Sequence, residues 1–367
     1  MNMVKICRKF LTGNGNHMNK QLLIDTAKEL LADDKGLLAI DESNNTCNKR
    51  FEIIGIPQTV EARRDWRELI ITTPDLNECI SGLILYDETI RQNGRKGLPI
   101  IKTILDAGII PGIKVDIGAK SMALFPKEKI TEGLDGLRER LNEYQNIGAR
   151  FAKWRAMIRV GSGSPSQACI EANAHALARY AALCQEANIM PIVEAEVLMN
   201  GDHDLERCLE ITKEFLRTIF NQLYRQAVML EGLILKPNMV LPGLTCKKQE
   251  TEAEVAYATV KCLLQSVPAA VPGIAFLSGG QSGKMASARL NAMNLIYKTK
   301  LPWALTFSFA RAIQQPALKI WCGEDSNSDA AQKALYHRAK CNQAARLGQY
   351  DTGMESPILN LPEPVPI

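Results

Sequence analysis

The feature that most constrains the fold of this chain is the alternation of short apolar runs with longer segments of helical spacing. The apolar runs, which contain β-branched or aromatic residues, lie at 36–40, 81–85, 109–115, 149–154, 190–197, 232–235, 274–277 and 303–307. The helical segments include 21–32, 60–71, 165–187, 204–227, 252–265 and 330–346. The apolar runs recur at roughly thirty to forty-five residues, which is the size of one βα unit.

Runs that are apolar on both faces are typical of parallel strands covered by helices. Eight of them in 367 residues favour a closed (β/α)8 barrel over an open doubly wound sheet. An open sheet usually carries a Gly-rich fingerprint after its first strand, whereas 41–45 contains no glycine. We therefore predict an α/β fold with a single TIM barrel over 21–347, a short N-terminal arm over 1–20 and a Pro/Gly-rich C-terminal tail over 348–367.

Composition and charge argue against several classes of function. A hydrophobic fraction of 46% is too high for a disordered chain, and a net charge of +4 does not favour a general nucleic-acid binder. The apolar runs are too short to cross a bilayer. The ten cysteines form no C-x-x-C pair and no secretory segment precedes them, which indicates reduced thiols in a cytoplasmic protein. The four histidines are isolated from one another and no Walker sequence is present, so we predict neither a metal nor a cofactor.

Ionisable side chains gather where the predicted strands end, and in a barrel the carboxyl ends of the strands form the active site. In chain order, these strand-end residues are Asp41, Lys114, Asp116, Lys153, Arg155, Glu194, Glu196, Lys236 and Arg311. Each has a structural explanation when taken alone, because a strand-end lysine often reaches water and paired carboxylates can form ion pairs inside a barrel. Their convergence at one end of the barrel predicts a catalytic site.

Lys236 is the strongest candidate for a nucleophile. It follows an apolar strand and precedes Pro237, so its backbone is held while its amine points into the opening of the barrel. Burial and a neighbouring cation such as Lys153 favour the neutral amine that attacks a ketone. The iminium that forms is an electron sink, so an adjacent carbon–carbon bond can break. Glu194 and Asp41 are the available groups for the proton transfers.

Two groups of residues are suited to bind phosphate. One group follows the seventh and eighth strands and consists of Ser278, Gly279, Gly280 and Arg311. Exposed backbone N–H groups and a guanidinium are the donors that bind phosphate in such barrels, although a Ser-Gly-Gly run alone more often marks a turn. The second group is expected on the opposite side of the barrel and consists of Ser43, Thr46, Arg50 and Lys114. Two anion sites that flank a lysine predict a substrate phosphorylated at both ends.

Seven of the strand-end segments together resemble the class I fructose-bisphosphate aldolases. They read LAIDES, IKVD, FAKWR, PIVEAE, LKPNM, FLSGGQ and ALTFS, and they begin at residues 38, 113, 151, 191, 235, 276 and 304. The segments occur in the order of the family, and the match extends from about residue 22 to 349. Because seven strand ends agree, the motifs are jointly specific.

The resemblance implies a metal-independent aldehyde-lyase of glycolysis and gluconeogenesis that needs no cofactor. It would reversibly cleave fructose 1,6-bisphosphate to dihydroxyacetone phosphate and glyceraldehyde 3-phosphate. By similarity, Lys236 is the Schiff-base lysine, and Glu194, with Glu196 beside it, assists imine formation. Asp41 and Lys153 match the groups that handle the C4 hydroxyl. The family is commonly tetrameric, so the resemblance implies a homotetramer with a phosphorylated sugar as its ligand and neither nucleic acid nor membrane as a partner.

The resemblance also divides the predicted phosphate ligands between the two ends of the substrate. The residues that match the C1-phosphate site are Ser278, Gly279 and Arg311, and Gly280 adjoins them. The residues that match the region of the C6-phosphate are Ser43, Thr46 and Lys114, and we include Arg50 and Arg155 among the substrate-binding residues.

Three departures from the family pattern bear on these expectations. Ala310 stands where the family usually has glycine, which could alter a backbone contact to phosphate, and Thr46 replaces a usual serine but keeps the hydroxyl. Many relatives end in a tyrosine that assists enamine protonation, whereas this sequence ends in Pro-Val-Pro-Ile and Tyr350 is its last tyrosine. We therefore expect deletion of 357–367 to change turnover little.

Two alternatives remain open from the sequence. A Schiff-base lyase for fructose 1-phosphate would tolerate the loss of Lys114 and Ser43, whereas an enzyme for the bisphosphate would not. A non-catalytic scaffold on an aldolase fold, which binds a protein partner, should have a broken catalytic set. Since all four core catalytic candidates are present, a scaffold role is expected at most in addition to catalysis.

Overall fold

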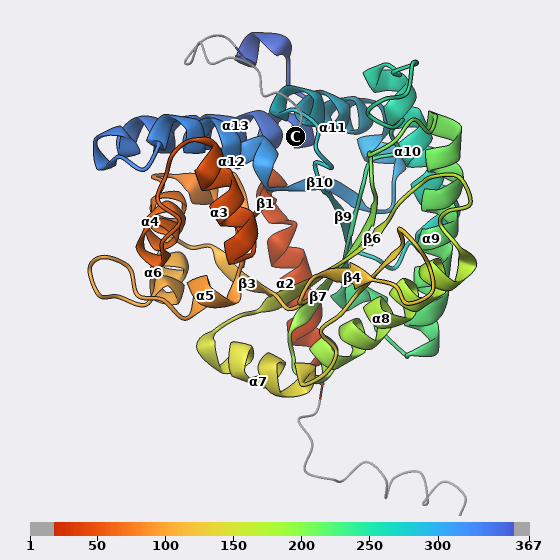
Figure 1. Cartoon of the computed structure of the whole chain (residues 1–367), viewed down its shortest axis with the longest axis horizontal. Coiled ribbons are helices and arrows are strands. Elements are labelled where there is room, and N and C mark those ends of the chain that lie inside the picture. Colours follow the sequence, from red (N-terminus) through yellow and green to blue (C-terminus); the bar gives the residue numbers. More distant parts are fainter. Residues whose placement is uncertain (1–17, 356–367) are drawn as a thin grey trace, which may run out of the picture.

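The structure, a computed structural model, describes residues 18–355, so residues 1–17 of the predicted arm and 356–367 of the predicted tail lie outside the described residues. Eight parallel strands close into a barrel in the order β1-β10-β9-β8-β7-β6-β3-β2 (Figure 1). Their bounds are β1 (Gly36–Ala39), β2 (Ile80–Leu85), β3 (Ile110–Lys114), β6 (Phe151–Ile158), β7 (Met190–Val197), β8 (Ile234–Pro237), β9 (Gly273–Phe276) and β10 (Ala304–Phe309). The prediction of an α/β TIM barrel is confirmed, because each predicted apolar run contains or overlaps one barrel strand.

Helices surround the barrel (Figure 1). Their bounds are α2 (Lys20–Leu30), α3 (Asn44–Ile53), α4 (Val60–Ile71), α5 (Asp87–Ile90), α6 (Ile100–Asp106), α7 (Leu137–Ile147), α8 (Gln167–Glu186), α9 (Leu205–Arg225), α10 (Glu252–Ser266), α11 (Gly283–Tyr297), α12 (Arg311–Trp321) and α13 (Ser328–Leu347). An antiparallel hairpin of β4 (Ala119–Ser121) and β5 (Lys129–Thr131) lies between β3 and α7 in the chain. None of the helices in residues 18–355 is long and apolar enough to span a membrane.

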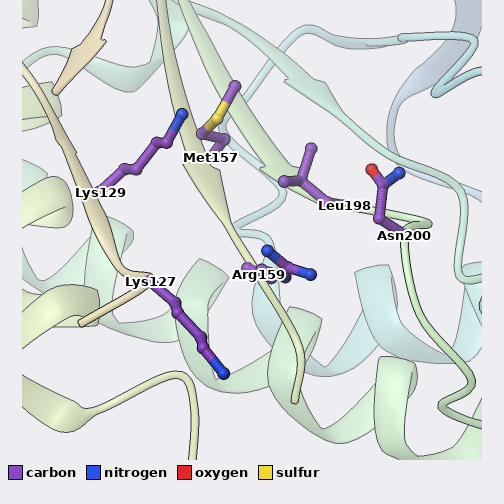
Figure 2. Close-up of a pocket in the computed structure, with 6 residues that line it drawn as sticks. All are labelled: Lys127, Lys129, Met157, Arg159, Leu198 and Asn200. Carbon is purple, nitrogen blue, oxygen red and sulfur yellow. The ribbon is translucent and has the colours of Figure 1, made fainter. Parts of the chain in front are cut away.

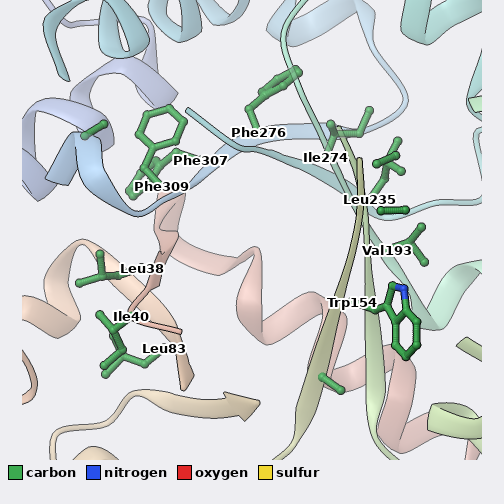
Figure 3. Packing of buried hydrophobic residues seen from close by; sticks show 14 of the residues in the cluster. Leu38, Ile40, Leu83, Trp154, Val193, Leu235, Ile274, Phe276, Phe307 and Phe309 are labelled. Carbon is green, nitrogen blue, oxygen red and sulfur yellow. The ribbon is translucent and has the colours of Figure 1, made fainter. Parts of the chain in front are cut away.

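Two hydrophobic cores lie on the two faces of the strands, because successive side chains of a strand point to opposite sides. The outer core packs the barrel against the helices and includes Leu38, Val193 and Leu235 (Figure 3). The inner core fills the barrel and includes Leu37 and Ile234, and residues of α2 pack into the same cluster. The interior of the barrel is therefore packed at the α2 end, which leaves only the opposite end for a polar site.

Side-chain caps fix where several helices begin. The carboxylate of Asp204 accepts a hydrogen bond from the backbone N–H of Arg207 at 2.8 Å and so caps α9. Thr251 and Glu254 form a reciprocal capping box at the start of α10. These caps satisfy N–H groups that the first helical turn would otherwise leave unpaired.

One strand boundary differs from the prediction. The run at 232–235 predicts a strand that ends before Lys236, whereas β8 spans Ile234–Pro237 and includes Lys236. Residues Leu230–Gly232 form a 3₁₀ turn beneath α2. A side chain at Gly232 would come within 2.8 Å of Leu23 Cβ, so the turn needs glycine to pack this closely against α2. Apolar composition alone does not distinguish such a turn from a strand.

Candidate active site

The alternation of the strands brings charged side chains into the barrel directly above the inner core. On β7, Ile192 belongs to the inner core and Glu194 is the next residue on the same face. On β8, Ile234 belongs to the inner core and Lys236 is next. On β6, Phe151 belongs to the inner core and Lys153 is next. Each is two residues beyond an inner-core position, roughly 7 Å along the strand, so the three side chains share one layer at the open end.

Four of the predicted catalytic residues form one connected set of ion pairs. Lys153 Nζ lies 2.6 Å from Asp41 Oδ2 and 3.0 Å from Glu194 Oε2. Lys236 Nζ lies 3.3 Å from Glu194 Oε1, the other oxygen of the same carboxylate. Lys153 and Lys236 are each 3% exposed, so these charges face one another with little water between them. The structure thus brings the predicted nucleophile, both predicted acid/base groups and a second lysine into direct contact.

The charges in this set stabilise one another. Burial would raise the pKa of Asp41, but the ammonium groups of Lys153 and Lys236 hold it well below its usual range. Burial also opposes ionisation of Glu194, yet the same two lysines lower its pKa below the ordinary value. For Lys153, burial would lower the pKa, but Asp41 and Glu194 raise it well above that of a free lysine. Asp41 and Glu194 are therefore available as proton acceptors at neutral pH, while Lys153 is a fixed positive charge.

The first predicted phosphate group assembles after β9 and β10. Gly279 and Gly280 have φ angles of +59° and +91°, a left-handed conformation that favours glycine. Arg311 begins α12, and its Nη2 would lie 3.4 Å from a Cβ built on Gly280. Ser278 is buried next to this turn. A glycine turn with successive left-handed residues beside a guanidinium is a geometry that suits an anion.

Lys114 and Arg155 lie on the opposite wall. β3 stands four places from β9 around the barrel, and β6 stands four places from β10. Lys114 Nζ is 3.3 Å from Asp116 Oδ1, and Arg155 Nη2 is 2.5 Å from Glu196 Oε2. Two cationic groups thus face each other across the barrel with Lys236 between them.

The remaining predicted residues lie on α3, which follows β1. Ser43 caps α3, and its hydroxyl lies 3.1 Å from that of Thr46. Arg50 Nη1 lies 2.6 Å from Glu42 Oε1. In the closed barrel β1 has β10 on one side and β2 on the other, so the strand that leads into α3 lies two places from β3, which carries Lys114, and two places from β9.

Ala310, which departs from the family pattern, is the N-cap residue of α12. Its φ is −112°, outside the left-handed region that favours glycine. The backbone at this position therefore has no positive φ that would require glycine next to Arg311.

Two acidic residues support the site without having been assigned a role from the sequence. Asp116 contacts Lys114, and its Oδ2 accepts a hydrogen bond from the backbone N–H of Arg155 at 3.2 Å. Glu42 forms ion pairs with both Arg50 and Arg67. The signal for Asp116 is its position two residues after Lys114, on the same face of the extended chain. The contact of Glu42 with Arg67 joins the loop after β1 to α4 and has no local signal.

Among residues 18–355, no cluster of three or more His, Cys, Asp or Glu side chains is arranged to hold a metal ion. Most of the ionisable residues of the site are instead paired as cation and carboxylate.

Comparisons with known proteins agree with this geometry. A family model described as the glycolytic fructose-bisphosphate aldolase class-I matches residues 22–359. A probable fructose-bisphosphate aldolase class 1 of Xanthomonas campestris is 54% identical over 334 residues, which cover 91% of this chain and 99% of that protein. The cytosolic fructose-bisphosphate aldolase 6 of Arabidopsis thaliana is 47% identical over 328 residues, which cover 89% of this chain and 91% of the relative.

A solved structure is similar over almost the whole described chain. It is fructose-bisphosphate aldolase from Plasmodium falciparum, in a ternary complex with TRAP and a small-molecule inhibitor. The TM-score is 0.89 at 43% sequence identity, and the match covers 91% of this chain and 96% of that chain.

Proposed function

The chain belongs to the class I fructose-bisphosphate aldolases, and from this premise we propose that Lys236 forms the imine with the substrate ketone while Glu194, Asp41 and Lys153 perform the proton transfers. Fructose-bisphosphate aldolase activity follows from the family. The observation that carries the assignment of roles is the connected set of ion pairs from Lys236 through Glu194 and Lys153 to Asp41.

Glu194 serves imine formation in this proposal. Its carboxylate, 3.3 Å from Lys236 Nζ, accepts a proton from the ammonium and frees the amine to attack C2 of the open-chain sugar. It then returns the proton to the C2 oxygen of the carbinolamine, which leaves as water. The product is a protonated imine that replaces the C2 carbonyl. The positive charge of Lys153 stabilises the anionic form of Glu194 before the first transfer and after the second.

Asp41 serves the cleavage of the carbon–carbon bond. Its lowered pKa keeps it ionised, so that it can accept the proton of the C4 hydroxyl. The electron pair of the C3–C4 bond then moves into the iminium, which becomes an enamine, and glyceraldehyde 3-phosphate leaves. Lys153 contacts Asp41 at 2.6 Å and stabilises the charge that develops at the C4 oxygen. Protonation of the enamine and hydrolysis of the imine release dihydroxyacetone phosphate and restore Lys236.

The two cationic walls are suited to hold the two ends of the substrate. Ser278, Gly279 and Arg311 are proposed to bind the C1-phosphate, with Gly280 shaping the turn. The residues proposed for the C6-phosphate are Ser43, Thr46, Arg50, Lys114 and Arg155. The support is electrostatic and geometric, because two anion sites on opposite walls hold an extended bisphosphate across Lys236.

We also propose the finer features that the resemblance implies, namely one barrel domain over 21–347, a homotetramer and a cytoplasmic location. Exposed apolar side chains on the outer helices, such as Tyr224 at 83% and Leu295 at 68%, support self-association. Sedimentation equilibrium would test this, and a monomer at micromolar concentration would contradict the tetramer.

Steady-state cleavage of fructose 1,6-bisphosphate in the presence of EDTA tests the proposed roles. We expect Lys236→Met to lower kcat by roughly 10⁴-fold or more, the scale seen when a nucleophile is removed. Lys213→Met, on the outer helix α9, is the matched control and should keep wild-type kcat. If Lys236→Met retained a substantial rate, the Schiff base would have to form elsewhere.

A further inference from the structure

A second cationic pocket lies beyond the active site, at the far ends of β6 and β7. Its volume is about 190 Å³, and it is lined by Lys127, Lys129, Met157, Arg159, Leu198 and Asn200. Figure 2 shows the two lysines on one side, Met157 and Arg159 in the middle and Leu198 and Asn200 on the other side. Three of the six lining residues are cations and none is acidic, so the pocket is built for a negative charge.

The pocket continues the face of the strands that carries the catalytic residues. Arg155, Met157 and Arg159 alternate on β6 and just after it, so they share the face of Lys153. Leu198 likewise follows Glu196 on the face of Glu194. Arg159 is four residues beyond Arg155, roughly 13 Å along the strand direction. A ligand in this pocket would therefore lie outside the reach of the reacting carbon atoms.

Two buried contacts fix the hairpin that supplies the lysines. Glu128 is 7% exposed, and its carboxylate accepts hydrogen bonds from both the backbone N–H and the hydroxyl of Ser166, at the start of α8. The buried Asn173 donates to the backbone carbonyl of Lys129 at 2.9 Å. Lys129 is the first residue of β5 and directly follows the anchored Glu128, and Lys127 lies in the turn just before it, with a φ of +70°. The backbone that carries the two lysines is therefore held against α8.

The three cations of the pocket have no carboxylate partner in the described part of the chain, unlike most cations of the active site. Lys114, Lys153 and Arg155 each form an ion pair with a carboxylate. Lys127, Lys129 and Arg159 form none within residues 18–355. Three like charges around one cavity repel one another, and an anion between them removes that repulsion.

We propose that this pocket binds the phosphoryl group of a small anion, as an accessory site separate from the catalytic residues. The guanidinium of Arg159 offers the planar fork that matches phosphate oxygens, and the two lysines add point charges. Asn200 can donate from its amide. Inorganic phosphate and a phosphate monoester share this chemistry, so both are potential ligands.

NMR of the methionine methyl groups detects binding in the pocket directly, because Met157 lines it. The protein is labelled at the methionine methyl groups, the Met157 signal is assigned with Met157→Leu, and inorganic phosphate or glycerol 3-phosphate is titrated at constant ionic strength. We expect a saturable shift of the Met157 signal with at least one ligand. If only inorganic phosphate or only glycerol 3-phosphate shifts the signal, that compound is the ligand. The proposal would be overturned if neither gave a saturable shift, or if sodium chloride gave an equal shift.

Variants separate this site from the catalytic one. The triple variant Lys127→Ala, Lys129→Ala and Arg159→Ala should weaken the binding reported by Met157 by roughly tenfold or more and leave kcat for cleavage unchanged. The control removes the same charge from exposed positions on α2, α9 and α10 through Lys28→Ala, Arg225→Ala and Lys261→Ala, and it should keep the shift. Equal weakening in both triple variants would show that only net charge matters.

Glu128→Ala is a further test, because net charge alone and the anchoring of the hairpin predict opposite changes in affinity for the anion. Removing a carboxylate near the pocket should strengthen anion binding if charge alone decided the affinity. Our account predicts weaker binding, because the hairpin loses its anchor at Ser166. Stronger binding by this variant, with the fold intact by circular dichroism, would contradict the presentation of the lysines by Glu128.

Discussion

Lys236 and Glu194 are paired across β8 and β7, and Lys236 Nζ lies 3.3 Å from Glu194 Oε1. Both residues are almost fully buried. The contact is fixed by the register of two strands, so it does not depend on a mobile loop. The proposed nucleophile and its proposed proton acceptor are thus positioned by the backbone of the barrel before any substrate enters.

The first prediction separates the roles of the two acid/base groups. Glu194→Gln should slow imine formation, whereas Asp41→Asn should permit the imine and slow cleavage of the C3–C4 bond, each lowering kcat by about 10²–10⁴-fold. Quenching single turnovers with borohydride measures the imine. Asp41→Asn should accumulate the trapped adduct of fructose 1,6-bisphosphate, and Glu194→Gln should not. The same adduct level in both variants would contradict the division of roles.

The second prediction concerns Lys114. Lys114→Ala removes a cation from the wall proposed to bind the C6-phosphate, so kcat/KM for fructose 1,6-bisphosphate should fall by roughly 10- to 100-fold, the scale of a charged hydrogen bond. Fructose 1-phosphate lacks that phosphate, and its kcat/KM should change much less. Lys120→Ala, on the exposed hairpin strand β4, is the matched control. An equal loss for both sugars would instead indicate a structural role for Lys114.

The third prediction concerns the phosphate turn. Gly280→Ala puts a methyl group on a residue with a φ of +91° and within 3.4 Å of Arg311 Nη2. We expect a higher KM and a loss of stability on the order of 1 kcal/mol. Gly55→Ala carries similar backbone strain, at a φ of +76°, but its methyl group would meet no atom within 4 Å. A KM that rises equally in both variants would show that strain, and not the anion site, is responsible.

The fourth prediction is a pH dependence of stability. Burial raises the pKa of Glu42, but Arg50 and Arg67 outweigh burial and bring the pKa down from 4.5 to about 2. A carboxyl whose pKa is lowered on folding stabilises the fold above its unfolded pKa, and this stabilisation disappears as the pH falls through the folded pKa. The contribution should therefore be ~3 kcal/mol at neutral pH and be lost between pH 4.5 and about 2.

Urea denaturation of Glu42→Gln against wild type from pH 7 to pH 2 measures this dependence. The difference in the free energy of unfolding should shrink as the pH falls. Glu52→Gln, an exposed change on α3, should show no such trend. A difference for Glu42→Gln that stays constant with pH would contradict the lowered pKa.

The barrel could be predicted from the sequence because each strand is buried on both faces and therefore reads as a continuous apolar run. The position of Lys236 above Ile234 follows from the same alternation. Other elements have weaker signals. Helix α3 carries polar residues over most of its length, and β4 and β5 have only three residues each. None of the three elements therefore shows a clear hydrophobic period in the sequence.

The contacts between residues of the site could not be predicted from local sequence patterns. Lys153 reaches both Asp41 and Glu194 only because the closed barrel brings β1 and β7 within reach of one side chain. Likewise, Lys127 and Arg159 line the same pocket, next to the point where Glu128 anchors the hairpin to the start of α8. Such contacts combine residues far apart in the chain, and spacing rules do not describe them.

The most direct test of the account is reduction by sodium borohydride of the protein mixed with dihydroxyacetone phosphate, followed by mass analysis of its peptides. Reduction turns a transient imine into a stable amine on the lysine that formed it. The account predicts one adduct, on Lys236, that is insensitive to EDTA and absent from Lys236→Met. An adduct on Lys153 or another lysine, or no adduct on any lysine, would contradict it.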